Sequence, residues 1–143
     1  RRYRALRIDP TLLVSKSSEK ATPEGVLFSH GRWFNGFHNR FRDIARGGLR
    51  IVIPQNVDQY HIEKTRIYDE VYALSNAQQL KNKDIHEGGA KAVVLVNTSD
   101  IPPAFRYSVV RTSTRTFTDS ALDLIVETST YNQTDYYQND ELI

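Results

Sequence analysis

The sequence contains no cysteine and no methionine, and it has a single tryptophan. Without cysteine the chain cannot form a disulfide framework, a cysteine zinc site or a thiol nucleophile. Methionine is missing even from position 1, so we expect the chain to be a piece of a longer protein. The longest aliphatic run, residues 90–96, contains a lysine and is far too short to cross a bilayer. The 143 residues are enough for one ordinary domain.

Acidic residues are scarce early in the chain, and basic residues are scarce late in it. Residues 1–50 carry 11 lysines and arginines against 4 acids, whereas residues 51–143 carry 8 against 13. No lysine or arginine follows Arg115. The asymmetry predicts an anionic partner for the N-terminal half, either a polyanion or small carboxylates or phosphates. Composition alone does not choose between them.

Hydrophobic periodicity predicts strands alternating with helices, which favours an α/β fold: a mixed β-sheet flanked by helices, in one domain over residues 1–143. The expected strands are 2–8, a pair within 25–44, 51–53 and 92–96, and the expected helices are about 58–83 and around 117–125. The longer helix is predicted because its segment lacks glycine and proline and has apolar residues at helical spacing.

Three segments carry more specific expectations. Gly36 lies in the second strand of the expected pair, where glycine marks a bulge or a close backbone approach. Pro102-Pro103 interrupts residues 97–116, which we expect to be irregular, with a hydroxyl residue near Thr116 capping the next helix. The polar, tyrosine-rich tail 131–140 is expected to lead to a part of the protein outside this sequence.

Two arginines flank a glycine pair in the segment Arg46-Gly47-Gly48-Leu49-Arg50. Glycines let a backbone turn sharply or approach a ligand. Guanidinium groups suit two-pronged capture of a carboxylate or phosphate. Taken alone, such a short segment is more commonly a tight turn with solvated arginines.

Two lysines are candidates for chemistry. Lys91 follows Gly88-Gly89-Ala90 at the start of an apolar strand, where its amine could serve as nucleophile, base or carbonyl polariser. The spacing of a P-loop is missing around it. Lys81 shares a helix face with Gln78, three residues earlier. The more common explanation for each is a solvated cation, at a strand start and at a helix C-terminus.

Arginines and aromatic residues interleave between residues 32 and 42. Such a pattern suits stacking on nucleic-acid bases. It also describes an amphipathic strand with an aromatic core face, which we favour because no nucleic-acid-binding signature supports the first explanation. The four histidines have no metal-ligand spacing, so no metal site is expected.

Taken together, these segments resemble the large, NAD-specific class of glutamate dehydrogenases. Three motifs carry the resemblance in the same order and at similar separations: 36–50, 78–84 and 87–91. The resemblance implies the substrate-binding and subunit-contact domain of an oxidoreductase of amino-acid metabolism. That enzyme would convert L-glutamate, NAD and water into 2-oxoglutarate, ammonium and NADH.

The resemblance also implies a role for each candidate residue. Lys91 would be the catalytic lysine that polarises the 2-oxo group, and Lys81 with Gln78 would bind the α-carboxylate. Arg46 takes the position of a lysine that meets the side-chain carboxylate in smaller glutamate dehydrogenases. Three further substrate-binding candidates follow from the resemblance. Gly47 and Gly48 would let the backbone approach the substrate, and Arg50 would support the positive charge of the pocket.

The chain lacks the Gly-x-Gly-x-x-Gly turn of a dinucleotide-binding domain. The resemblance therefore implies that NAD is bound by a nucleotide-binding domain outside this chain and that the chain alone is inactive. It further implies an intracellular homo-oligomer, cytoplasmic or mitochondrial, with no metal and with neither nucleic acid nor membrane as partner.

Two other functions stay open. Ala92 stands where the family usually has glycine, and His86 stands where it commonly has proline. These departures favour, as the runner-up, a binding or regulatory module that has kept the fold and lost catalysis. The third possibility is a basic nucleic-acid-binding domain that uses the arginines and aromatic residues between positions 32 and 42.

Overall fold

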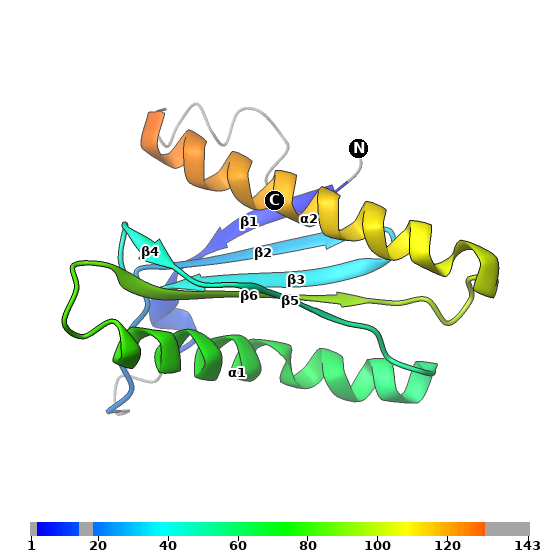
Figure 1. The fold of residues 1–143 in the computed structure, drawn as a ribbon, viewed down its shortest axis with the longest axis horizontal. Helices are drawn as coiled ribbons and strands as arrows, with labels where there is room; N and C mark the ends of the chain where they lie inside the picture. Colours follow the sequence, from blue (N-terminus) through cyan, green and yellow to red (C-terminus); the bar gives the residue numbers. More distant parts are fainter. Residues whose placement is uncertain (1–2, 15–18, 131–143) are drawn as a thin grey trace.

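A mixed β-sheet with one long helix on each face makes up the fold (Figure 1). The computed structural model describes residues 3–14 and 19–130, so the prediction for the tail lies outside the described residues. The elements are β1 (Tyr3–Ile8), the 3-10 helix η1 (Pro10–Leu12), β2 (Gly25–Gly31), β3 (Phe34–Arg40), β4 (Ala45–Arg46), β5 (Leu49–Val52), α1 (Val57–Lys81), β6 (Gly88–Val96) and α2 (Pro103–Thr130). The predicted α/β class is confirmed.

The last strand of the described residues, β6, lies inside the sheet. Strands β1, β2, β3 and β6 pair in that order, all antiparallel. On its other edge β6 pairs in parallel with β4 and then, further along, with β5. The sheet is therefore mixed, and the two short strands that cover the far edge of β6 come from the segment that contains the glycine pair.

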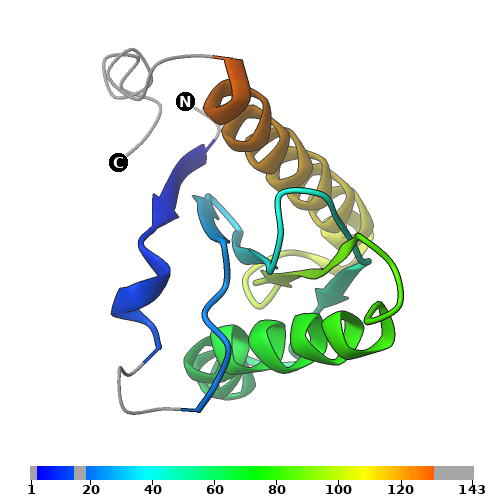
Figure 2. The same ribbon diagram turned by 90° about the vertical axis from the view of Figure 1, so that its left-hand side faces the viewer.

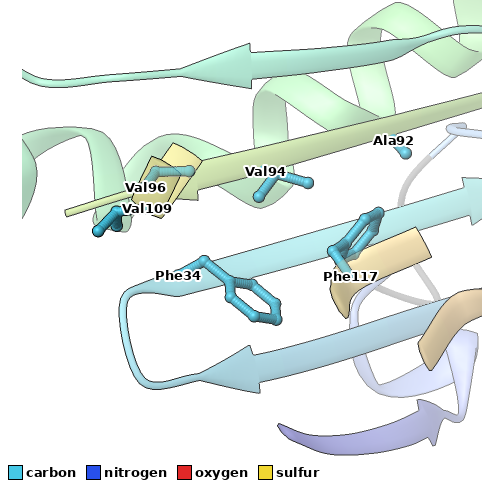
Figure 3. Close-up of a cluster of buried hydrophobic side chains, with 6 residues drawn as sticks. All are labelled: Phe34, Ala92, Val94, Val96, Val109 and Phe117. Atoms are coloured by element: carbon cyan, nitrogen blue, oxygen red, sulfur yellow. The ribbon is translucent and has the colours of Figure 1, made fainter. Parts of the chain in front are cut away.

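The two faces of β6 pack against different helices, as Figure 2 shows. Val93 and Leu95 face α1 and pack with its Ile67 and Val71. The alternate residues face α2 in a second cluster (Figure 3), formed by Phe34, Ala92, Val94, Val96, Val109 and Phe117. Because successive side chains of a strand point to opposite faces, each residue of β6 can be assigned to one helix or the other.

Helix α1 confirms the longer predicted helix to within a few residues. It begins after Asn56, whose side chain accepts a hydrogen bond from the backbone N–H of Gln59 at 2.8 Å. It ends at Lys81, and the N–H of the capping residue Asn82 still donates to the carbonyl of Gln78 at 3.1 Å. The buried stripe expected from helical spacing is present at Ile67 and Val71.

Helix α2 begins at Pro103, so the predictions of an irregular 97–116 and of a cap near Thr116 are wrong. Proline is suited to the first turn of a helix, where its missing N–H leaves no bond unmade. The buried face of α2 combines apolar side chains with serines at helical spacing, namely Val109, Ser113, Phe117, Ser120 and Leu124. A search for apolar periodicity does not detect such a face.

Gly36 marks a close approach and not a bulge. The pairing of β3 with β2 and with β6 continues through Gly36 without an extra residue. A Cβ atom at this position would lie 2.4 Å from ring atoms of Phe117 on α2. The predicted bulge is therefore wrong, and the group that approaches Gly36 closely is a side chain and not another backbone segment. The other predicted strands are present within a few residues, and β4 is a short strand that the sequence did not reveal.

Candidate functional site

The glycine pair forms the break between β4 and β5, alongside the start of β6. Arg46 pairs with Gly89, and Leu49 pairs with Ala92. Gly47 and Gly48 therefore lie beside the segment that carries Lys91. Two of the motifs chosen from the sequence are thus neighbours in the fold.

Each glycine of the pair lies against this part of β6 at close range. A Cβ atom on Gly47 would lie 1.5 Å from the carbonyl oxygen of Ala90, so only hydrogen fits there. A Cβ atom on Gly48 would lie 3.3 Å from Nζ of Lys91, and the Gly48 carbonyl accepts a bond from Ala92 N–H at 3.0 Å. The amine of Lys91 therefore lies over the exposed backbone of Gly48.

Lys91 is half-buried and belongs to the face of β6 that α1 covers, because it alternates with Val93. The methyl group of Ala92 points to the opposite face and packs in the cluster with Phe117. Alanine at this position thus contributes to the core beneath α2. It does not occupy the surface that presents the Lys91 amine.

The end of α1 packs directly on the backbone at the start of β6. A Cβ atom on Gly89 would lie 2.2 Å from the backbone nitrogen of Gln79 and 2.3 Å from the carbonyl oxygen of Ser75. The Gly89 N–H donates to Oε1 of Gln79 at 2.6 Å. The glycines before Lys91 therefore allow the helix and the strand to approach each other closely. This approach places the remaining motif, residues 78–84, beside the other two.

Asn82 connects these three segments, and sequence reasoning missed it. Its side chain is 3% exposed, and its Nδ2 donates to the Gly88 carbonyl at 3.2 Å. Its Oδ1 accepts from Nε2 of Gln78 at 3.0 Å and makes a longer contact of 3.5 Å with the Arg46 guanidinium. An asparagine directly after a helix, four residues beyond Gln78, was the available signal.

Both arginines of the glycine segment form ion pairs within the chain. The Nε of Arg46 lies 3.3 Å from a carboxylate oxygen of Glu87. A guanidinium nitrogen of Arg50 lies 2.7 Å from a carboxylate oxygen of Glu70 on α1. Because Arg46 is largely exposed, an incoming carboxylate can reach its guanidinium group. That carboxylate would compete with Glu87 for the guanidinium.

The structure brings most of the predicted site residues together. Gln78 and Arg46 meet at Asn82, and Gly48 meets Lys91. Lys81 is exposed on the last turn of α1, and among the described residues no hydrogen bond or ion pair joins its amine to another candidate. The arrangement offers cations, an amide and open backbone at one end of the sheet, which is the chemistry that binds small carboxylates.

Other kinds of site were also sought among residues 3–14 and 19–130. No group of three or more histidine, aspartate or glutamate side chains could hold a metal ion there. Neither α1 nor α2 combines the length and the apolar character that spanning a bilayer requires. Neither strand-to-helix connection, at 53–56 or 97–102, contains the glycines of a dinucleotide-binding turn.

Comparison with known proteins gives related sequences. No protein-family model matches the chain. NAD-specific glutamate dehydrogenase of Saccharomyces cerevisiae is 41% identical over 122 residues, which are 85% of this chain and 11% of that protein. Glutamate dehydrogenase 2 of Dictyostelium discoideum matches with the same identity and coverage. A probable NAD-specific glutamate dehydrogenase of Schizosaccharomyces pombe is 44% identical over 92 residues, 64% of this chain and 8% of that one. The chain spans about a tenth of the length of these relatives.

Proposed function

Since this chain is a segment of the NAD-specific glutamate dehydrogenase family, we propose that it forms the substrate-binding part of such an enzyme. The parent enzyme interconverts L-glutamate, NAD and water with 2-oxoglutarate, ammonium and NADH. The observation that carries the proposal is the position of Lys91. Its amine lies over the open backbone of Gly48, and the network of Arg46, Asn82 and Gln78 lies at the same end of the sheet.

In this proposal each side chain acts on a defined part of the substrate. The Lys91 ammonium hydrogen-bonds the 2-oxo oxygen and stabilises the negative charge that develops there when ammonia adds. In the opposite direction the same group assists the attack of water on the 2-imino carbon. Lys81 and Gln78 hold the α-carboxylate, while Arg46 leaves Glu87 to pair with the side-chain carboxylate. Gly47 lets the backbone pass close against Ala90, and Gly48 leaves room for the substrate beside the Lys91 amine.

Arg50 has a supporting role in this proposal. It lies on the α1 face of the sheet, as Lys91 does, and contributes positive charge while paired with Glu70. NAD, which accepts the hydride, is assigned to a domain outside this chain because the strand-to-helix connections here do not fit a dinucleotide. Assembly into a homo-oligomer is part of the same proposal and is measured by sedimentation of the full-length enzyme.

Substitution of Lys91 in the full-length enzyme tests this function. Loss of a group that acts in the transition state typically costs about 10²–10⁴-fold in turnover. We expect Lys91→Ala to lose turnover on that scale, whereas Lys64→Ala, an exposed lysine on α1, leaves it unchanged. If Lys91→Ala keeps most of the turnover, the chain is a binding or regulatory module and not part of the catalytic site.

The chain by itself provides a second test. A substrate pocket without a cofactor domain cannot transfer hydride, so we expect no NADH from L-glutamate and NAD with the purified 143-residue chain. NADH formation by that chain, with contaminating enzyme excluded by the Lys91→Ala variant, would overturn the division of roles between the two domains.

A further inference from the structure

An internal ion pair occupies the part of the candidate site that is assigned to the side-chain carboxylate of the substrate. The Nε of Arg46 lies 3.3 Å from a carboxylate oxygen of Glu87, where β4 runs beside the start of β6. Solvent reaches both side chains, at 63% exposure for Arg46 and 43% for Glu87. The side chain of Glu87 ends in the same group as the side chain of L-glutamate. Glu87 therefore holds Arg46 in the way that the substrate would.

A second neighbour keeps the Arg46 guanidinium close to the end of α1. One of its terminal nitrogens makes a contact of 3.5 Å with Oδ1 of Asn82, and the Asn82 side chain is itself buried. Within the described ranges Glu87 is the acidic residue that pairs with Arg46. When Glu87 is displaced, the guanidinium thus gains an open position for a carboxylate while its contact with Asn82 remains.

The backbone beside Glu87 is fixed, but the Glu87 side chain is not. Glu87 directly precedes Gly88, whose carbonyl accepts a hydrogen bond from Nδ2 of Asn82 at 3.2 Å. For the Glu87 carboxylate, the described part of the chain shows no partner besides Arg46. The side chain can therefore swing away from Arg46 without moving the strand that carries Lys91.

We propose that Glu87 is an internal competitor for the side-chain carboxylate and thereby a specificity-determining residue of this site. The inference rests on the proposed function, in which Arg46 binds that carboxylate. L-glutamate displaces Glu87, and the cost of breaking the ion pair is subtracted from its binding energy. An amino acid with an uncharged side chain leaves the pair intact and avoids this cost. Glu87 therefore lowers both the affinity for L-glutamate and the preference for it over uncharged analogues.

Glu87→Gln in the full-length enzyme tests the inference, because glutamine keeps the shape of the side chain and removes its charge. An exposed ion pair contributes little, equivalent to about a two- to fivefold change in affinity. We expect the KM for L-glutamate to fall by about that factor while kcat stays the same, since substrate and transition state gain the same contact. The measurement is the initial rate of NADH formation at saturating NAD. Asp84→Asn removes the same charge from an exposed position of the connection between α1 and β6, and as the matched control it should leave the KM unchanged.

L-Norvaline measures the effect on selectivity, because it has a methyl group in place of the side-chain carboxylate of L-glutamate. In Glu87→Gln the Arg46 guanidinium is left unpaired next to that methyl group. We expect the ratio of kcat/KM for L-glutamate to kcat/KM for L-norvaline to rise at least about twofold in this variant and to stay the same in Asp84→Asn. An equal gain for both substrates would overturn the inference, because Glu87 would then not act through Arg46.

Arg46→Gln separates a failure of this inference from a failure of the proposed function. We expect this variant to raise the KM for L-glutamate at least about tenfold, and the addition of Glu87→Gln to have no further effect. If Arg46→Gln leaves the KM unchanged, Arg46 does not bind the side-chain carboxylate, and the assignment and the inference fail together. If Arg46→Gln raises the KM but Glu87→Gln alone does not lower it, only the inference fails. Thermal unfolding verifies that the variants fold.

Discussion

At the scale of single residues, the candidate site depends on a buried amide as much as on its charged groups. Asn82 uses both ends of its side chain, donating to the Gly88 carbonyl and accepting from Gln78. Its position therefore determines how the end of α1 meets the start of β6. Lys91 lies only three residues beyond the Gly88 carbonyl that Asn82 binds. We therefore expect a substitution of Asn82 to shift the position of the Lys91 amine.

We expect Asn82→Ala to lower the free energy of unfolding by about 1–3 kcal/mol, because buried polar partners lose their hydrogen bonds. The measurement is urea unfolding of the purified chain. Asn76→Ala, on the same helix, is the matched control and should be neutral or slightly stabilising, since alanine is the better helix former. Equal stability of the two variants would show that Asn82 does not hold the segments together.

His38 makes a second prediction at this scale. Burial, and secondarily the charge of Arg40, lowers the pKa of His38 from 6.5 to about 4. Between these values the unfolded chain binds a proton that the folded chain does not, so stability falls as the pH falls from 6.5 to 4. We expect a loss of about 2 kcal/mol from pH 7 to pH 5 that His38→Gln abolishes. His86→Gln, at an exposed position, should leave the loss unchanged when unfolding is measured at both pH values.

At the scale of elements, the break between β4 and β5 separates two glycines with different tasks. A methyl group on Gly47 would collide with the backbone of β6, whereas one on Gly48 would meet only the flexible end of Lys91. We expect Gly47→Ala to cost more than about 2 kcal/mol of stability and Gly48→Ala less than about 1 kcal/mol. Urea unfolding of both variants measures the difference.

The Gly47 and Gly48 variants also distinguish an effect on stability from an effect on turnover. Gly48→Ala displaces the Lys91 amine without unfolding the sheet, so turnover of the full-length enzyme should fall although stability is retained. If Gly47→Ala proves as stable as Gly48→Ala, the close approach to Ala90 is incorrect. If Gly48→Ala keeps full turnover, the amine does not need its place over that backbone.

Helix α2 packs on the sheet through the contact between Phe117 and Gly36. Because a methyl group on Gly36 would overlap the Phe117 ring, Gly36→Ala should destabilise the chain by about 1–3 kcal/mol. Phe117→Leu relieves the overlap. The double variant should therefore lose at least about 0.5 kcal/mol less stability than the sum of the losses of the two single variants. Gly25→Ala is the control, because its methyl group would meet only the flexible side chains of Arg40 at 3.3 Å and Arg7 at 3.5 Å. Strict additivity would place Phe117 elsewhere.

At the scale of the whole molecule, the sequence was informative where one physical signal dominated. Apolar periodicity located α1 and the strands, and glycine next to charge located the segments around Arg46 and Lys91. The sequence was uninformative where polar and apolar residues share a buried face, or where an element depends on a partner far along the chain. The serines on the buried face of α2 hid the first half of that helix, and two-residue β4 exists only because β6 lies beside it.

The site shows the same division. The residue types at Arg46, Gln78 and Lys91 could be chosen from the sequence, because the chemistry of carboxylate binding restricts them. The ion pairs to Glu87 and Glu70 could not, since they depend on how strands and helix meet in space. A groove between α2 and the β2–β3 turn was equally hidden, because the arginines that line it, Arg32, Arg111 and Arg115, come from segments about eighty residues apart.

The central place of β6 also bears on how the chain folds during synthesis. Its neighbours β3 and β5 both precede it in the sequence, so the ribosome releases them while the place between them is still empty. Until residues 88–96 emerge, β3 and β5 expose unpaired backbone edges, which are prone to pair with other chains. The strand that carries Lys91 is thus the one that completes the sheet, and a nascent chain that stalls before Gly88 has neither a finished fold nor a site.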